Sequence, residues 1–179
     1  MDVKQGQWFY DAIKFVDEKG LFEGTSATTF SPNDPMTRAM LVTVLYRLEG
    51  EPAGGSHNFS DVAAGLWYSD AVAWAAGNNV VKGISDTLFD PNSDVTREQI
   101  AQILYNYAGS KGYDTAASSA LDSFTDGAAV ASWAQDAVKW AVGAGLVEGK
   151  DGGALDPAGS ATRAEVATML QRFVNQFVK

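Results

Sequence analysis

Apolar residues recur along the chain at helical spacing, first in a segment that opens with a tryptophan. The pattern i, i+4, i+7, i+8 is filled by Trp67, Ala71, Trp74 and Ala75, by Trp133, Ala137, Trp140 and Ala141, and by Trp8, Ala12, Phe15 and Val16. One apolar face at this period predicts an amphipathic helix whose core-facing stripe begins at the tryptophan. We expect each helix to end near Gly20, Asn79 or Gly145, because Gly and Asn accept the left-handed backbone found at helix C-termini.

A second helical pattern follows each first one. Its apolar stripe comprises Leu41, Val44, Leu45 and Leu48, then Ile100, Ile103, Leu104 and Tyr107, then Val166, Met169, Leu170 and Phe173. Thr96 with Gln99, and Thr162 with Glu165, have the spacing of N-terminal capping boxes. The residue after each capping threonine would then be the first of the helix. It is an arginine each time, although the start of a helix disfavours a cation.

These residues mark three copies of one unit. Trp8, Trp67 and Trp133 lie 59 and 66 residues apart, and Arg38, Arg97 and Arg163 share both spacings. An aspartate, a glycine and a proline keep fixed offsets from the tryptophan in every copy.

We place the three repeats at residues 1–50, 59–108 and 124–179. The linkers 51–58 and 109–123 are rich in small and turn-forming residues. Each copy is too small to bury both of its stripes well, so the three are expected to form one structural unit.

Composition excludes several kinds of function. The net charge of −9 argues against nucleic acid, whose binding requires basic side chains. There is no cysteine and only one histidine, His57, so a disulfide framework, a thiolate metal site and a histidine triad are ruled out. The stretch 90–96 hints at a calcium loop but has Val95 where that loop needs glycine, and Ala101 where it needs glutamate. We therefore expect no catalytic residues, no metal and no cofactor.

No apolar run is long enough to span a bilayer. The first ten residues lack the apolar core of a signal peptide. The protein is thus either intracellular, or its signal was removed or lies outside this sequence.

The repeated residues resemble the S-layer homology (SLH) family. The resemblance rests on "FSDV" (59–62), "WYSDAVAWA" (67–75), "VKG" (81–83) and "LFDPNSDVTREQ" (88–99), which return in the third repeat as "FTDG" (124–127), "WAQDAVKWA" and "ATRAE". The first repeat keeps only Asp2 and Val3 of its opening motif and has Met40 in place of the motif's glutamate.

The resemblance implies an all-α, mostly helical fold. In that fold the second helices form a central three-helix bundle, three helix-loop prongs project from it, and the whole is a pseudo-threefold spindle. It also implies a partner, the secondary cell-wall polysaccharide linked to peptidoglycan, bound between prongs through a hexosamine carrying a pyruvate ketal. The expected location is extracellular, at the cell wall.

The family's ligand-binding roles transfer to matching positions. The arginines Arg38, Arg97 and Arg163 would bind the carboxylate, and the opening aspartates Asp2, Asp61 and Asp126 would accept sugar hydroxyls. Gly24, Gly83 and Gly149 would let the backbone approach the sugar. Lys82 stands beside the turn glycine, where the other repeats have Glu23 and Glu148, glutamates that would repel an anion. On this basis Arg97, in the same repeat as Lys82, is the strongest single candidate.

Structural alternatives stand beside these roles. The tryptophans at 8, 67 and 133 are expected in the core rather than on ligand. The arginines could instead form salt bridges to a neighbouring repeat, and the opening aspartates could cap the turn before the first helix. For the whole chain, the alternative to glycan binding is a helical structural or protein-interaction module that binds no carbohydrate.

Overall fold

The computed structural model describes residues 2–178 and is built from helices. The α-helices are α1 (Tyr10–Glu18), α2 (Arg38–Leu48), α3 (Ser69–Gly77), α4 (Arg97–Ser110), α5 (Gln135–Gly143) and α6 (Arg163–Phe177), and the short 3-10 helices are η1 (Gly127–Ala129), η2 (Ser132–Ala134) and η3 (Asp151–Gly153). Residues 2–178 contain isolated β-bridges but no strand. The all-α expectation is confirmed.

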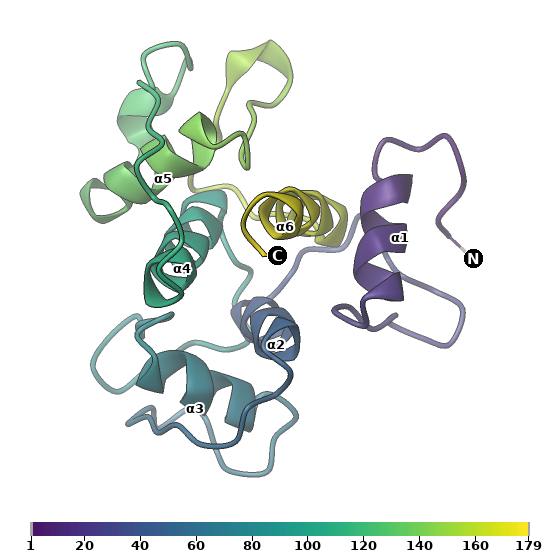
Figure 1. The fold of residues 1–179 in the computed structure, drawn as a ribbon, viewed down its shortest axis with the longest axis vertical. Helices are drawn as coiled ribbons and strands as arrows, with labels where there is room; N and C mark the ends of the chain where they lie inside the picture. The colour runs from purple at the N-terminus through teal and green to yellow at the C-terminus, as the bar shows by residue number, and fades with distance from the viewer. Residues whose placement is uncertain (1, 179) are drawn as a thin grey trace.

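The second helices α2, α4 and α6 lie in the middle of the molecule, and α1, α3 and α5 lie outside them (Figure 1). Each outer helix packs on the inner helix of the preceding repeat, α3 on α2 and α5 on α4. The first repeat completes the pattern, because α1 packs on α6. The three repeats therefore close into a ring in which each buries its neighbour's apolar surface.

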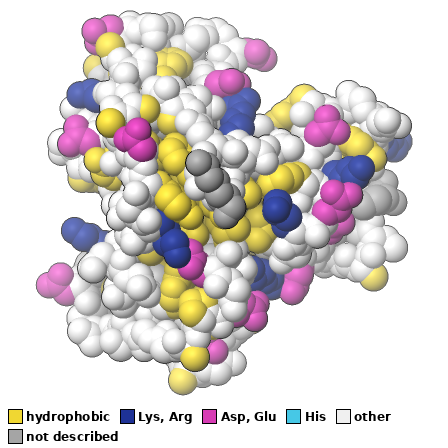
Figure 2. Space-filling view, viewed as in Figure 1, with side chains coloured by type: hydrophobic (Ala, Val, Ile, Leu, Met, Phe, Trp, Pro, Cys, Tyr) yellow, Lys and Arg dark blue, Asp and Glu magenta, His cyan; other side chains and the backbone are white. Residues whose placement is uncertain are grey.

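The core follows the stripes of the inner helices. Leu45, Leu104 and Leu170 are fully buried, and Tyr107 stacks near Phe173 with 5.6 Å between ring centroids. Hydrophobic side chains are gathered around the middle of the face in Figure 2, while acidic and basic side chains alternate over its outer parts.

Local helix signals are confirmed where the sequence placed them. Thr96 with Gln99 and Thr162 with Glu165 form both hydrogen bonds of a capping box. Thr37 only accepts a bond from the Met40 N–H, since methionine cannot return one. The residues near which the outer helices were expected to end all have a left-handed φ, namely Gly20, Asn79 and Gly145.

The predicted place of the first tryptophans is wrong. Trp8, Trp67 and Trp133 are 66%, 61% and 55% exposed, and α1, α3 and α5 each begin two residues later. The next residue takes the buried position instead, namely Phe9, Tyr68 or Ala134. The helical pattern fitted both frames, because an apolar residue follows each of the three tryptophans.

Candidate functional site

Each motif arginine reaches from its own repeat into the next one. Arg38 donates from Nε to the Phe89 carbonyl over 2.9 Å and from Nη2 to the Lys82 carbonyl over 3.1 Å. Arg97 does the same to Leu155 and Glu148 of the third repeat. Arg163 closes the ring by donating to Phe30 and Glu23 of the first repeat.

The three arginines are nearly buried, with 4–5% of each residue exposed. Burial lowers the pKa of each guanidinium, but an arginine stays protonated at neutral pH because its ordinary pKa exceeds 12. The expected alternative of a bridge to the neighbouring repeat is thus present, although its acceptors are mainly backbone carbonyls. Arg97 alone among the three has an acidic partner within 4.0 Å in residues 2–178, Glu165 at 3.5 Å.

Lys82 lies beside Arg38 and not beside Arg97. The two line an open cavity of about 550 Å³, together with Gly83, Ile84, Gln99, Gln102, Ile103, Asn106 and Trp133. Because every arginine enters the following repeat, the turn of the second repeat faces the arginine of the first. The sequence argument that favoured Arg97 for its proximity to Lys82 is therefore wrong.

Part of the Arg38 guanidinium remains available in this cavity. Its Nε and Nη2 hold the two carbonyls, and no residue in the described part of the chain accepts a hydrogen bond from Nη1. A guanidinium held rigidly by two bonds offers its remaining N–H groups in a fixed plane, which suits a carboxylate.

The opening aspartates bind the chain's own backbone. Asp61 accepts the N–H groups of Phe89 and Asp90 over 2.9 and 2.7 Å, one on each carboxylate oxygen. Asp2 and Asp126 make the same pair of bonds in their repeats. The second donor of each pair has a positive φ, namely Ser31, Asp90 or Asp156. The carboxylates therefore fix the connector after the outer helix rather than cap the turn before it, and their expected contact with sugar stays a prediction.

These bonds lower the pKa of all three carboxyls. For Asp126 the Leu155 N–H is the largest cause, and for Asp2 it is the Phe30 N–H. Burial raises the pKa of Asp61, but the N–H groups of Phe89 and Asp90 outweigh it.

The turn glycine serves packing first. A Cβ on Gly83 would lie 2.3 Å from the Ser85 carbonyl oxygen and 2.6 Å from the Phe59 ring. No side chain larger than hydrogen fits there, whatever binds in the cavity. The expected approach of sugar to Gly24, Gly83 and Gly149 stays a prediction, and Gly83 lines the cavity.

Trp133 and Asn106 are cavity residues that the sequence analysis did not select. Trp133 belongs to the third repeat, so the cavity draws on all three repeats. Asn106 occupies the position of Arg47 and Arg172, at the same 59 and 66 residue spacings, which is a signal the sequence contained.

Within residues 2–178, acidic and histidine side chains nowhere cluster as they would around a metal ion. None of the described helices has both the length and the apolar character to cross a bilayer.

Fold and site together define a class: tandem helical repeats closed into a ring, with an arginine crossing each junction. The model of the S-layer homology domain family matches residues 2–39, 58–101 and 123–167, and the chain belongs to this family as three tandem modules. Membership makes the chain a module of the kind that anchors proteins at the cell surface.

Curated relatives agree along most of the chain. The Surface-layer 125 kDa protein of Lysinibacillus sphaericus is 29% identical over 167 residues, which is 92% of this chain and 14% of the relative. The Endoglucanase of Bacillus sp. (strain KSM-635) is 32% identical over 94% of this chain and 18% of its own length. The Cellulosome-anchoring protein of Acetivibrio thermocellus is 30% identical over 58% of this chain and 24% of its own. The chain thus spans less than a quarter of each of these relatives.

Proposed function

We propose that the chain anchors a polypeptide to the cell wall by binding an anionic secondary wall polysaccharide in the grooves between its repeats. The ligand we infer is a hexosamine carrying a pyruvate ketal, attached to peptidoglycan. The observation that carries this proposal is the cavity at Arg38, which is lined both by a guanidinium with a free edge and by the exposed Trp133. A sugar that carries an acidic ketal offers a carboxylate to the guanidinium of Arg38. Its sugar ring offers an apolar face to Trp133.

The exposure of the three tryptophans supports a ligand role. Each leaves more than half of its surface in water, at the equivalent position of its repeat. A scaffold gains nothing from that placement, because burying an aromatic ring is favourable. A glycan module uses such a ring as a flat apolar surface.

The surface charge requires binding to be local. The chain has a net charge of −9, and basic side chains on the face in Figure 2 are interspersed with acidic ones. A diffuse attraction to an acidic polymer is therefore unavailable, and long-range fields oppose the encounter. Affinity must come from the groove itself.

Purified sacculi test the proposal. The chain is expected to sediment with intact sacculi and to remain in solution once their polysaccharide has been removed. Trp133→Ala should weaken sedimentation without changing the melting temperature, because the side chain is exposed. Equal binding to intact and stripped sacculi would refute glycan binding and favour the protein-interaction alternative.

A further inference from the structure

Two positions next to the turn carry side chains whose charge differs between the repeats. The residue before the turn glycine is Glu23, Lys82 or Glu148, and the residue facing it from the inner helix is Arg47, Asn106 or Arg172. The inner-helix residue makes one shared contact in all three repeats, a side-chain donor bonded to the Leu21, Val80 or Leu146 carbonyl. The site is built alike three times, and only its charges differ.

In the first and third repeats these positions neutralise each other. Arg47 pairs with Glu23 at 2.7 Å and Arg172 pairs with Glu148 at 2.8 Å. Each glutamate also supplies the backbone carbonyl that holds the arginine of the preceding repeat in the ring. The position that Lys82 holds in the second repeat is therefore filled in the other two by an acid already paired with an arginine.

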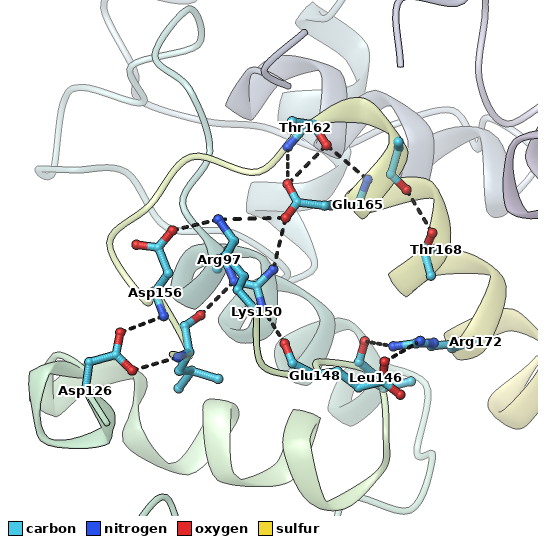
Figure 3. A network of polar contacts seen from close by, with 12 residues as sticks. Arg97, Asp126, Leu146, Glu148, Lys150, Asp156, Thr162, Glu165, Thr168 and Arg172 are labelled. Atoms are coloured by element: carbon cyan, nitrogen blue, oxygen red, sulfur yellow. Dashed lines mark hydrogen bonds and ion pairs between the residues drawn. The ribbon is translucent and has the colours of Figure 1, made fainter. Parts of the chain in front are cut away.

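The third repeat adds two more acids around Arg97. Glu165 lies 3.5 Å from its Nη1, and Lys150 bridges Asp156 and Glu165 at 2.6 and 3.8 Å (Figure 3). In this groove Arg97, Lys150 and Arg172 therefore each already have a carboxylate partner within the chain.

The groove of Arg38 differs at each of these positions. Gln99 stands where Glu165 stands, Asn106 replaces the arginine, and Lys82 replaces the glutamate. Lys82 is exposed and has no ion pair among residues 2–178. The negative charges that act on the Arg38 pKa are those of Asp90 and Asp61, and both oxygens of Asp61 are occupied by backbone N–H groups.

We propose that the Arg38 groove is the single groove that accepts the acidic substituent, and that Lys82 and Asn106 determine this selectivity. In the Arg97 groove Glu165 already pairs with the arginine, and in the Arg163 groove the Glu23–Arg47 pair occupies the positions that Lys82 and Asn106 hold in the Arg38 groove. The inference rests on the proposed function, since it assigns the carboxylate of that ligand to one groove. Lys82 and the free edge of Arg38 hold the carboxylate, and Gln99, Gln102 and Asn106 offer neutral hydrogen-bonding groups around it.

The test uses two probes, a hexosamine disaccharide with a pyruvate ketal and the same disaccharide without it. The parent chain should bind the acidic probe at one site per chain in calorimetry, about 10- to 100-fold more tightly than the neutral probe. The variant Lys82→Glu/Asn106→Arg installs the pair that repeats one and three already carry. It should bind both probes with equal affinity.

A reciprocal variant tests sufficiency. Glu148→Lys/Arg172→Asn/Glu165→Gln gives the Arg97 groove the residues of the Arg38 groove, and should raise the number of acidic-probe sites from one to two. Lys82→Gln changes one exposed side chain and therefore keeps the fold; it should lose part of the preference for the acidic probe.

The outcomes separate the two proposals. If the parent chain binds neither sacculi nor either probe, the proposed function fails. If the parent prefers the acidic probe but Lys82→Gln and the exchange variant retain that full preference, or if the parent binds two or three acidic probes, only the groove assignment is overturned.

Discussion

The guanidinium of Arg38 and the backbone carbonyl of Phe89 belong to different repeats and are joined by a 2.9 Å hydrogen bond from Nε. The same bond links Arg97 to Leu155 and Arg163 to Phe30, so it occurs once at every junction of the ring. The motif arginine is therefore part of the fold before any ligand arrives. The ligand role that we propose for Arg38 would use only the N–H groups that these bonds leave free.

Replacing a motif arginine is expected to destabilise the protein. In Arg38→Ala the carbonyls of Phe89 and Lys82 lose their donor, and leaving such groups unpaired should reduce the free energy of unfolding by about 2–4 kcal/mol. Urea denaturation would measure this, with Lys82→Ala as the exposed control, expected within about 0.5 kcal/mol of the parent. An unchanged unfolding midpoint for Arg38→Ala would show that the junction bonds contribute little.

The structural role of the arginines makes their variants poor tests of ligand binding. The sequence alone favoured Arg97 as the strongest single candidate for ligand binding. Arg97 bonds two carbonyls and lies 3.5 Å from Glu165, so its removal disturbs both. Exchanges at Lys82 and Asn106 separate binding from folding better, because other repeats already tolerate the exchanged residues.

A single repeat should not fold alone. In residues 59–108, α3 would lose α2 and α4 would lose α5, the helices on which each packs. Trp74 would lose Tyr46, and Tyr105 would lose Trp140. We expect the isolated second repeat to show little helical circular dichroism and no cooperative melt, whereas the full chain melts in one transition. A cooperative transition in the fragment at ordinary temperatures would argue against the shared core.

The local features of the fold could be predicted from the sequence. The contacts that join one repeat to the next could not. Thr96 and Gln99 cap their helix through residues three apart, so the motif contains its own partner. Arg38 finds Phe89 fifty-one residues away, and no nearby residue signals that the arginine enters the next repeat. The error over Lys82 and Arg97 came from pairing residues within one repeat.

The prediction that the tryptophans are buried was wrong for a different reason. Trp67 and Tyr68 are adjacent and apolar, so a helical stripe can be drawn through either. The choice depends on where α3 begins, which is Ser69, and on the face of α3 that packs on α2. The structure buries Tyr68 and exposes Trp67.

Acid should weaken the fold through the opening aspartates. Their pKa values are lowered in the folded chain, so their stabilisation is fully present above the unfolded value of about 3.9 and is lost as pH falls through the lower folded value. The free energy of unfolding should therefore decline below about pH 4.

The variant Asp126→Asn tests whether the opening aspartates cause this loss of stability in acid. An amide keeps one acceptor but presents N–H donors to the second backbone N–H, so the variant should be less stable at neutral pH and show a shallower decline toward pH 2.5. Urea midpoints across that range measure both effects, and Asp122→Asn serves as an exposed control. An acid decline as steep in Asp126→Asn as in the parent would assign it to other carboxyls.

Salt should affect glycan binding only weakly. In the binding that we propose, Lys82 and Arg38 attract a carboxylate while the net charge of −9 repels the polymer as a whole, and added ions screen both forces. Raising sodium chloride from about 0.05 to 0.5 M, which shortens the screening length from roughly 14 to 4 Å, should lower affinity for the acidic probe by less than about tenfold. The association rate on sacculi should rise with the first additions of salt, because the long-range repulsion is screened first. A loss of affinity on the order of a thousandfold, as in polyelectrolyte binding, would contradict recognition by one groove.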